Sequence, residues 1–178
     1  AGVVFAVTLN NTGYAMVRQA REMIAAGELG KLRVVHTSYM QDWLTLPIDA
    51  DGQKQAEWRT DPARAGLSAC LADIGVHAHN LASYITGLEL LEVSAELTTF
   101  VPNRRLDDNA HVLLRYEDGA RGVLLASQVA PGNYNSLSIG VYGAKGGVEW
   151  HGEEPELLKF TRFGEATRIL VRGGPENT

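Results

Sequence analysis

The spacing of apolar residues predicts a helix near the start of the chain and a strand directly after it. Between residues 13 and 27, apolar side chains recur every three or four positions, which is the period of one helix face. That face carries Met16, Ala20, Met23 and Ile24. Gly27 lies where a helix C-cap belongs, and the apolar run 32–40 has the composition of a strand.

A second helix is predicted over 73–86, after a long segment without periodicity. Residues 41–72 contain prolines and glycines that interrupt regular structure, and a loop of this length inside a domain is usually functional. The apolar face of the second helix carries Ile74, Ala78, Leu81 and Ile85. Asp73 suits the N-terminus of this helix, and Gly87 suits its end.

From residue 90 onward the apolar period changes to two, which indicates strands with one buried face. The predicted strands are 91–99, 109–116, 120–129, 136–142, 147–151, 157–162 and 167–171. The pair Asp118–Gly119 is a strong hairpin signal, and the glycines around 143–147 mark another turn. Helices that cover one face of such strands make an α+β fold, with an open and mainly antiparallel sheet.

The chain opens with a continuous apolar run, residues 3–9. A run without alternation is typical of a strand buried on both faces, so we predict a strand here. The run is far too short to span a bilayer, and no basic segment or cleavage site marks a secretory signal.

Composition and charge narrow the class of protein. Hydrophobic residues make up 45% of the chain and charged residues 21%, which are ordinary values for a globular domain. The net charge of −5 argues against nucleic acid as a partner, because phosphate binding needs clustered Lys and Arg. A single cysteine excludes an internal disulfide and fits a reducing compartment, so we expect a cytoplasmic protein without membrane partners.

Asp73 and His77 are the strongest candidates for chemistry. Residues four apart on a helix share a face, so the carboxylate and the imidazole should project together toward whatever the long loop encloses. A histidine beside a carboxylate suits general acid–base catalysis. Alternatively, Asp73 is only a helix cap and His77 a surface or core histidine, which is the commoner origin of this spacing.

Other polar residues have simpler interpretations. His77 and His79 lie two apart on a helix and point in different directions, so we expect no metal site there. Cys70 has no separate histidine to activate it and is interpreted as a small packing residue. His36 and His111 lie in predicted strands, as sheet-surface residues, and Trp43 is interpreted as a packing anchor.

Three segments together resemble one known family. The run 58–87, WRTDPARAGLSACLADIGVHAHNLASYITG, resembles the glucose–fructose oxidoreductase / inositol dehydrogenase (Gfo/Idh/MocA) superfamily, whose members commonly show Trp-Arg-x-Asp-Pro followed by Asp-Ile-Gly-x-His. Residues 13–35 and 97–122 are similar to its first helix and strand and its first sheet hairpins. The resemblance covers essentially the whole chain, and the order and spacing of the motifs are specific.

The resemblance implies roles for individual residues. His77 matches the histidine that transfers a proton, and Asp73 its acidic partner, which would orient the ring. Trp58 and Arg59 match a loop pair that approaches the nicotinamide or the substrate. Four further residues are candidates for substrate binding near the cleft, with structural roles equally open for the first three: Asn10, Tyr14, Arg18 and Asn80, the last at a position often occupied by Asp.

The resemblance also implies a missing half. The sequence holds no G-x-G-x-x-G after an opening strand and no Glu-Lys-Pro motif, so NAD or NADP should be held mainly by an N-terminal domain outside this chain. Residues 1–10 are then the remnant last strand of that dinucleotide-binding domain, and 11–178 form the substrate-side domain. The chain alone should be inactive.

The implied activity is a nicotinamide-dependent oxidation of a sugar, a polyol or a related compound. The main alternative is a module without catalysis, which binds carbohydrate or serves oligomerisation through the sheet. Relatives commonly associate through this sheet, so a homo-oligomer is expected in either case.

Overall fold

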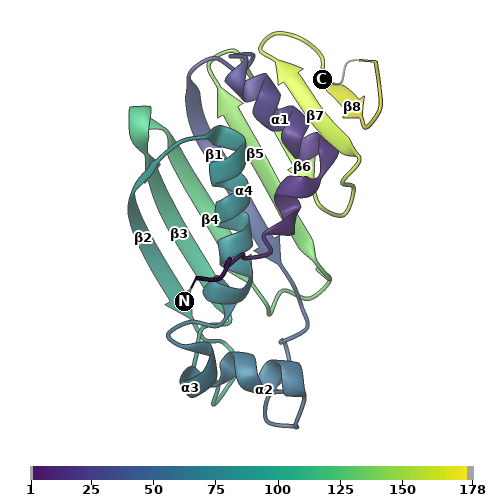
Figure 1. Ribbon diagram of the computed structural model, residues 1–178. Helices are drawn as coiled ribbons and strands as arrows, with labels where there is room; N and C mark the ends of the chain where they lie inside the picture. The colour runs from purple at the N-terminus through teal and green to yellow at the C-terminus, as the bar shows by residue number, and fades with distance from the viewer. Residues whose placement is uncertain (1, 176–178) are drawn as a thin grey trace.

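The computed structural model describes residues 2–175, which form an open eight-stranded sheet with helices on one face (Figure 1). The strand order is β2-β3-β4-β1-β5-β6-β7-β8. The strands are β1 (Leu32–Met40), β2 (Leu90–Thr98), β3 (Asn109–Tyr116), β4 (Arg121–Ser127), β5 (Ser136–Gly143), β6 (Gly146–His151), β7 (Leu157–Arg162) and β8 (Arg168–Val171). The predicted α+β class and every strand from residue 32 onward are confirmed, with bounds that shift by at most a few residues.

The centre of the sheet contains its one parallel pair among the described strands. β1 runs parallel to β4, with Val35 opposite Gly122, and antiparallel to β5. All the remaining pairs are antiparallel. Because strand β1 lies between β4 and β5, the long segment after β1 begins at the end of the central strands.

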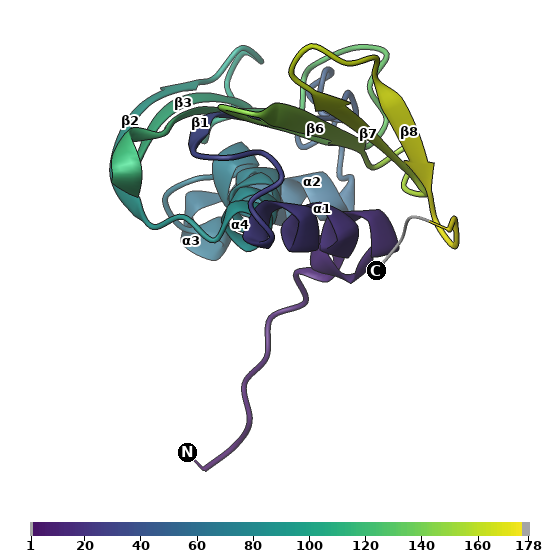
Figure 2. The same ribbon diagram turned by 90° about the horizontal axis from the view of Figure 1, so that it is seen from above.

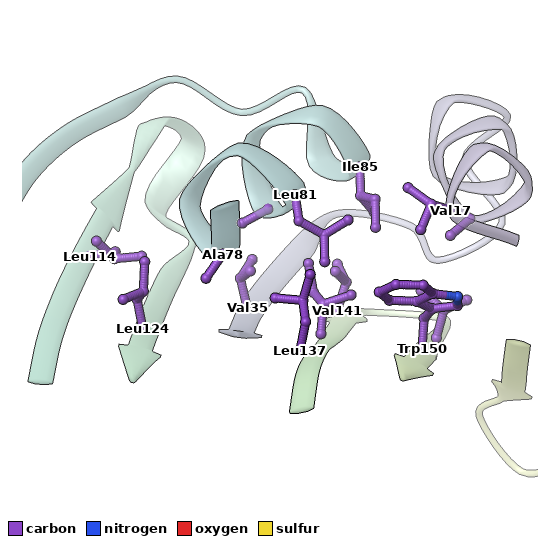
Figure 3. Close-up of a cluster of buried hydrophobic side chains, with 14 of the residues drawn as sticks. Val17, Val35, Ala78, Leu81, Ile85, Leu114, Leu124, Leu137, Val141 and Trp150 are labelled. Carbon is purple, nitrogen blue, oxygen red and sulfur yellow. The ribbon is translucent and has the colours of Figure 1, made fainter. Parts of the chain in front are cut away.

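Two helices cover one face of the sheet. α1 (Ala15–Ala25) and α4 (Val76–Thr86) lie side by side beneath the strands (Figure 2). Their buried residues meet those of the strands in one core, as Figure 3 shows for Leu81 and Ile85 of α4 against Val141 of β5. Ala78 and Ala82 are small and fully buried, which lets α4 approach the sheet closely. As predicted, Gly27 and Gly87 follow the two helices with positive φ.

The long segment after β1 contains two short helices that periodicity did not indicate. α2 (Lys54–Thr60) and α3 (Pro62–Ala65) lie beyond one end of the sheet (Figure 1). Local side chains define them: Gln53 accepts a hydrogen bond from Ala56 N, and Asp61 accepts one from Ala63 N. Pro62 at the first position of α3 needs no amide hydrogen there. The Asp-Pro part of the Trp-Arg-x-Asp-Pro motif therefore has a structural role.

A buried arginine fastens this segment to the sheet. Arg104, in the β2–β3 connection, donates to Leu44 O at 2.9 Å and to Asp49 Oδ1 at 2.8 Å. It also pairs with Asp108 at 3.0 Å, and both side chains are fully enclosed. The Asp108 carboxylate in turn accepts from the backbone amides of Phe100 and Val101. The loop is therefore held in place by charged hydrogen bonds in the interior.

The strand predicted over 3–9 is wrong for this structure. The segment has no regular structure and extends away from the body of the domain (Figure 2). Its valines and Phe5 are 67–98% exposed, and only Leu9, at its end, is half-buried. A strand needs a neighbour to bond its backbone, and the described chain offers none here. Its assignment to an adjoining domain stays a prediction.

The opposite face of the sheet carries no helix among residues 2–175 (Figure 2). His36 and His111 lie exposed on strands β1 and β3, as predicted. Leu113 is 61% exposed beside them, on the face that lies opposite to the buried Leu114. None of the described helices is long and apolar enough to cross a membrane.

Candidate active site

An open hollow lies where β1 ends and α4 begins. Its volume is about 470 Å³. The side chains that line it come from the end of β1, from the long segment after it, from the start of the second helical region and from the β4–β5 connection: Tyr39, Gln41, Trp43, Gln53, Gln55, Arg59, Asp73, Ile74, His77 and Tyr134. The structure therefore brings both members of the predicted pair, Asp73 and His77, to one hollow.

Asp73 lies in a π-helical turn, η2 (Leu71–Gly75), that leads directly into α4. The sequence predicted a regular helix start here, and π-turns of this kind are frequent at functional sites. Asp107 fixes the beginning of the turn, because its carboxylate accepts from Ala69 N at 2.8 Å and Leu71 N at 2.9 Å. At Gly75 a side chain would lie 2.5 Å from Leu71 Cδ1, so any larger residue here would displace the Leu71 side chain.

The Asp73 carboxylate is held from two sides. Arg59 Nε donates to Oδ1 at 3.2 Å, and the Gln128 amide donates to Oδ2 at 2.8 Å. Hydrogen bonds to an ionised carboxylate are stronger than neutral ones. The two donors therefore fix the direction in which the carboxylate faces the hollow.

Arg59 links the carboxylate to the wall of the hollow. Its guanidinium donates to Gln55 O and Oε1 and lies 4.2 Å from the centre of the Trp58 ring. Trp58 is itself half-buried and donates to Gln55 Oε1 at 3.2 Å. Trp58 and Arg59 therefore act as one unit, in which the arginine contacts the hollow directly and the tryptophan supports it.

His77 is positioned by Asn11, not by Asp73. Asn11 Nδ2 lies 3.2 Å from His77 Nδ1. An amide nitrogen can only donate, so Nδ1 accepts, and the neutral ring then carries its proton on Nε2. No hydrogen bond or ion pair joins Asp73 to His77 within residues 2–175, which contradicts the expectation that Asp73 orients the ring.

The rim of the hollow is a chain of uncharged hydrogen bonds. Tyr39 OH and Gln41 Nε2 both donate to Asn135 Oδ1, at 2.7 and 2.9 Å. Trp43 Nε1 donates to Gln41 Oε1 at 2.9 Å, so Trp43 belongs to the hollow and lies outside the hydrophobic core, where a packing anchor was expected. Burial raises the pKa of Tyr39, which remains a neutral phenol at physiological pH.

Five predicted binding residues lie outside the lining of the hollow: Trp58, which supports Arg59 from behind, and the four described next. Tyr14 packs on Trp150, with ring centres 5.4 Å apart. Arg18 is exposed and donates to Gly13 O at 2.7 Å. Asn10 is exposed in the 3-10 turn η1 (Asn10–Gly13), and Asn80 is half-buried on α4. Their contact with a ligand stays a prediction.

Sequence reasoning missed two residues that hold the candidate pair, Asn11 and Gln128. Asn11 is 66 positions from His77, and Gln128 is 55 positions from Asp73. Each is a single amide without a motif around it. Only the general abundance of Gln in the 41–55 segment could have indicated a polar site.

The remaining chemistry near the hollow is limited. Cys70 is fully buried, and burial raises the pKa of its thiol, which keeps it unreactive as expected. Residues 2–175 contain no group of three His, Cys, Asp or Glu side chains arranged to hold a metal ion. The hollow is thus equipped for proton transfer and for hydrogen bonding.

Comparison with known proteins gives this arrangement a family. The family model described as the GFO/IDH/MocA C-terminal domain matches residues 17–149. This chain belongs to that family. The predicted resemblance is confirmed, and the open sheet with its covering helices is the C-terminal domain of these oxidoreductases.

Three relatives show how far the similarity extends. An uncharacterised oxidoreductase of Bacillus subtilis, YfiI, is 34% identical over 176 residues, which are 98% of this chain and 45% of the relative. An inositol dehydrogenase homologue of Azotobacter vinelandii, solved with NAD+, superposes with a TM-score of 0.93 at 33% identity, over 97% of this chain and 44% of the other. A levoglucosan dehydrogenase solved with NADH and levoglucosan superposes with a TM-score of 0.86 at 26% identity, over 96% of this chain and 48% of the other. The chain therefore spans less than half the length of each relative.

Proposed function

We propose that this chain is the substrate-side domain of a nicotinamide-dependent oxidoreductase that acts on a sugar, a polyol or a related compound. The observation that carries the proposal is the hollow in which His77, Asp73 and Arg59 meet. The family provides the reaction class, and the two ligand-bound relatives hold NAD+ or NADH.

The lining of the hollow suits a polyhydroxylated ligand. Gln41, Gln53 and Gln55 offer amides, each of which can donate to and accept from hydroxyl groups. Trp43 and Tyr134 offer flat apolar surfaces for the C–H groups of a sugar ring. The levoglucosan dehydrogenase among the relatives binds a sugar of this kind.

The charges of the hollow suit a cofactor that is held elsewhere. Among the described lining residues, Arg59 is the one arginine or lysine, and Asp73 pairs with it. A pyrophosphate needs unpaired cations or a helix N-terminus with a glycine-rich turn, and the hollow offers neither. The residues fit the nicotinamide end of NAD or NADP. The phosphates would be held by a separate dinucleotide-binding domain, and residues 1–10 would supply the last strand of that domain.

In this scheme the cofactor supplies a hydride acceptor or donor, and the protein moves the proton. Oxidation of a hydroxyl requires a base, and His77 is the candidate. To act as a base, Nε2 of His77 must be unprotonated, so the neutral ring must carry its proton on Nδ1. Asn11 permits this tautomer when its side-chain amide rotates, because Oδ1 then accepts a hydrogen bond from Nδ1. Asp73 then serves as a fixed acceptor for a substrate hydroxyl and lies near the imidazolium that forms.

Replacement of His77 tests this function in the full-length protein. With NAD or NADP and a panel of sugars and polyols, His77→Ala should lower kcat by about 100-fold or more. His79→Ala is the matched control, because His79 is half-buried on the same helix and outside the lining of the hollow, so its turnover should equal that of the wild type. Equal turnover in His77→Ala and wild type would contradict the role of His77.

The alternative, a binding or association module without catalysis, has its own supporting observation. The face of the sheet without helices exposes Val34, Leu113, Ile169 and Val171. A second copy of the chain would cover these residues, and this use of the sheet is compatible with catalysis at the hollow.

A further inference from the structure

Gln128 is fixed in the interior at the end of β4. Its side chain is 0% exposed. The backbone amide donates to Asp108 O at 2.9 Å, and the backbone carbonyl accepts from Leu44 N at 3.0 Å. These bonds tie Gln128 to the β2–β3 connection on one side and to the long loop on the other.

The side-chain amide of Gln128 is only half satisfied. Nε2 donates to Asp73 Oδ2 at 2.8 Å and reaches Gln41 Oε1 at 3.4 Å. Oε1 is enclosed and has no hydrogen-bond partner. A buried acceptor without a partner destabilises a fold, and this cost offsets the stability that the hydrogen bond to the Asp73 carboxylate contributes. Stability alone therefore does not explain an amide at this position.

The geometry explains the amide through Asp73. Arg59, the other donor to this carboxylate, comes from a seven-residue helix and is 25% exposed in its side chain. Gln128 instead comes from the sheet and is shielded from water. Its hydrogen bond to Asp73 therefore sets the plane of the carboxylate relative to the rigid part of the domain.

We propose that Gln128 is a positioning residue for the reaction, which holds the Asp73 carboxylate in its working orientation. The proposal rests on the function proposed above for the hollow. It assigns to Gln128 no contact with substrate or cofactor, because its side chain lies outside the lining of the hollow.

The first test is Gln128→Met in the full-length protein, with turnover and thermal unfolding measured together. Met matches the length of Gln and cannot donate to Asp73. We expect kcat to fall about 10- to 100-fold, as for a catalytic group misplaced by a fraction of an ångström, with KM little changed. The unfolding temperature should change little, because removal of the unpartnered oxygen offsets the loss of the hydrogen bond to Asp73.

The pH dependence of turnover in Gln128→Glu distinguishes a positioning role from a purely structural one. A protonated carboxyl can donate to Asp73 as the amide does, whereas an ionised one repels it. The turnover of Gln128→Glu relative to wild type should therefore rise as the pH is lowered. The same ratio for Gln128→Met should stay constant with pH.

Tyr116→Phe is the matched control. Tyr116 also carries a buried polar atom without a partner, its hydroxyl, but lies at the far end of β3. Its replacement should maintain or raise stability and leave kcat unchanged.

The outcomes separate the two proposals. If wild type turns over and Gln128→Met equals it, or loses kcat only together with its folded structure, the role of Gln128 is refuted while the proposed function stands. If the turnover of Gln128→Glu relative to wild type does not change with pH, the role of Gln128 is likewise refuted while the proposed function stands. If the wild-type protein turns over no sugar or polyol with either cofactor, both proposals fail together.

Discussion

At the scale of single residues, the hollow is organised by amides that hold the ionisable groups. Asn11 contacts His77, Gln128 contacts Asp73, and Gln55 contacts Arg59. The sequence indicated the three ionisable residues because they lie in recognisable motifs. It could not indicate the amides, because two of them come from segments more than 50 positions away and no periodicity relates the partners.

The contact between Asn11 and His77 leads to a prediction about the tautomer of the ring. Asn11→Asp offers only acceptors to Nδ1, which leaves Nε2 free to take a proton, so oxidation should proceed at a rate near that of the wild type. Asn11→Leu removes both the donor and the acceptor from Nδ1 of His77. The kcat for oxidation should then fall about 10-fold or more, as when a catalytic histidine loses its orienting partner. Steady-state kinetics of the two variants with one polyol measure the difference. Identical rates in Asn11→Leu and wild type would show that the ring needs no such partner.

At the scale of elements, the sequence predicted the helices and strands whose pattern is local, and missed or misassigned those that depend on capping residues or on a distant partner. Strands and long helices were predicted because their periodicity is local, as in β3, where buried and exposed positions alternate. α2 and α3 were missed because four to seven residues are too few for a period and depend on caps such as Gln53. The strand over 3–9 was wrong because apolar residues alone do not form a strand without a partner.

The position of the long segment depends on Arg104, which gives a prediction at this scale. Arg104→Met leaves the enclosed Asp108 without its cation and should lower the free energy of unfolding by about 3–5 kcal/mol. Arg105→Met is the matched control, because Arg105 is the exposed neighbour in the sequence, and it should change little. Urea unfolding of the full-length variants at neutral pH measures both. A similar decrease in the free energy of unfolding in the two variants would contradict the role of Arg104 in anchoring the long segment.

The same cluster predicts a pH dependence. Burial acts to raise the pKa of Asp49, but hydrogen bonds from Arg104 and the backbone outweigh it and place the pKa below the usual value of 3.8. A lowered pKa adds stability above 3.8, and this stability is lost as the pH falls through the folded-state value. The difference in unfolding free energy between wild type and Arg104→Met should therefore narrow below pH 3.8.

At the scale of the whole molecule, the two faces of the sheet have different surroundings. One face packs against α1 and α4, while the other exposes apolar residues to solvent (Figure 2). The hollow lies at the end of the covered face, so the proposed association through the open face would leave it accessible. The proposed catalysis and the proposed association are therefore compatible in one domain.

A pair of matched variants tests the association. Leu113 and Val93 are both 61% exposed, but Val93 pairs across from the buried Leu114 and thus lies on the other face. We expect Leu113→Asp to reduce the sedimenting mass of the full-length protein and Val93→Asp to leave it unchanged, because only the first places a charge in the interface. Dissociation by Val93→Asp alone, or a monomeric wild type, would contradict association through the open face.

We propose that the hollow between β1 and α4 receives the substrate and that His77 accepts or donates its proton. A crystal structure of the full-length protein with NAD or NADP and a polyol that it turns over would test both statements at once. We expect a substrate hydroxyl within about 3 Å of His77 Nε2, above a nicotinamide ring that closes the hollow. A polyol bound elsewhere, or a His77 ring turned away from the polyol, would refute the proposed roles of the hollow and of His77.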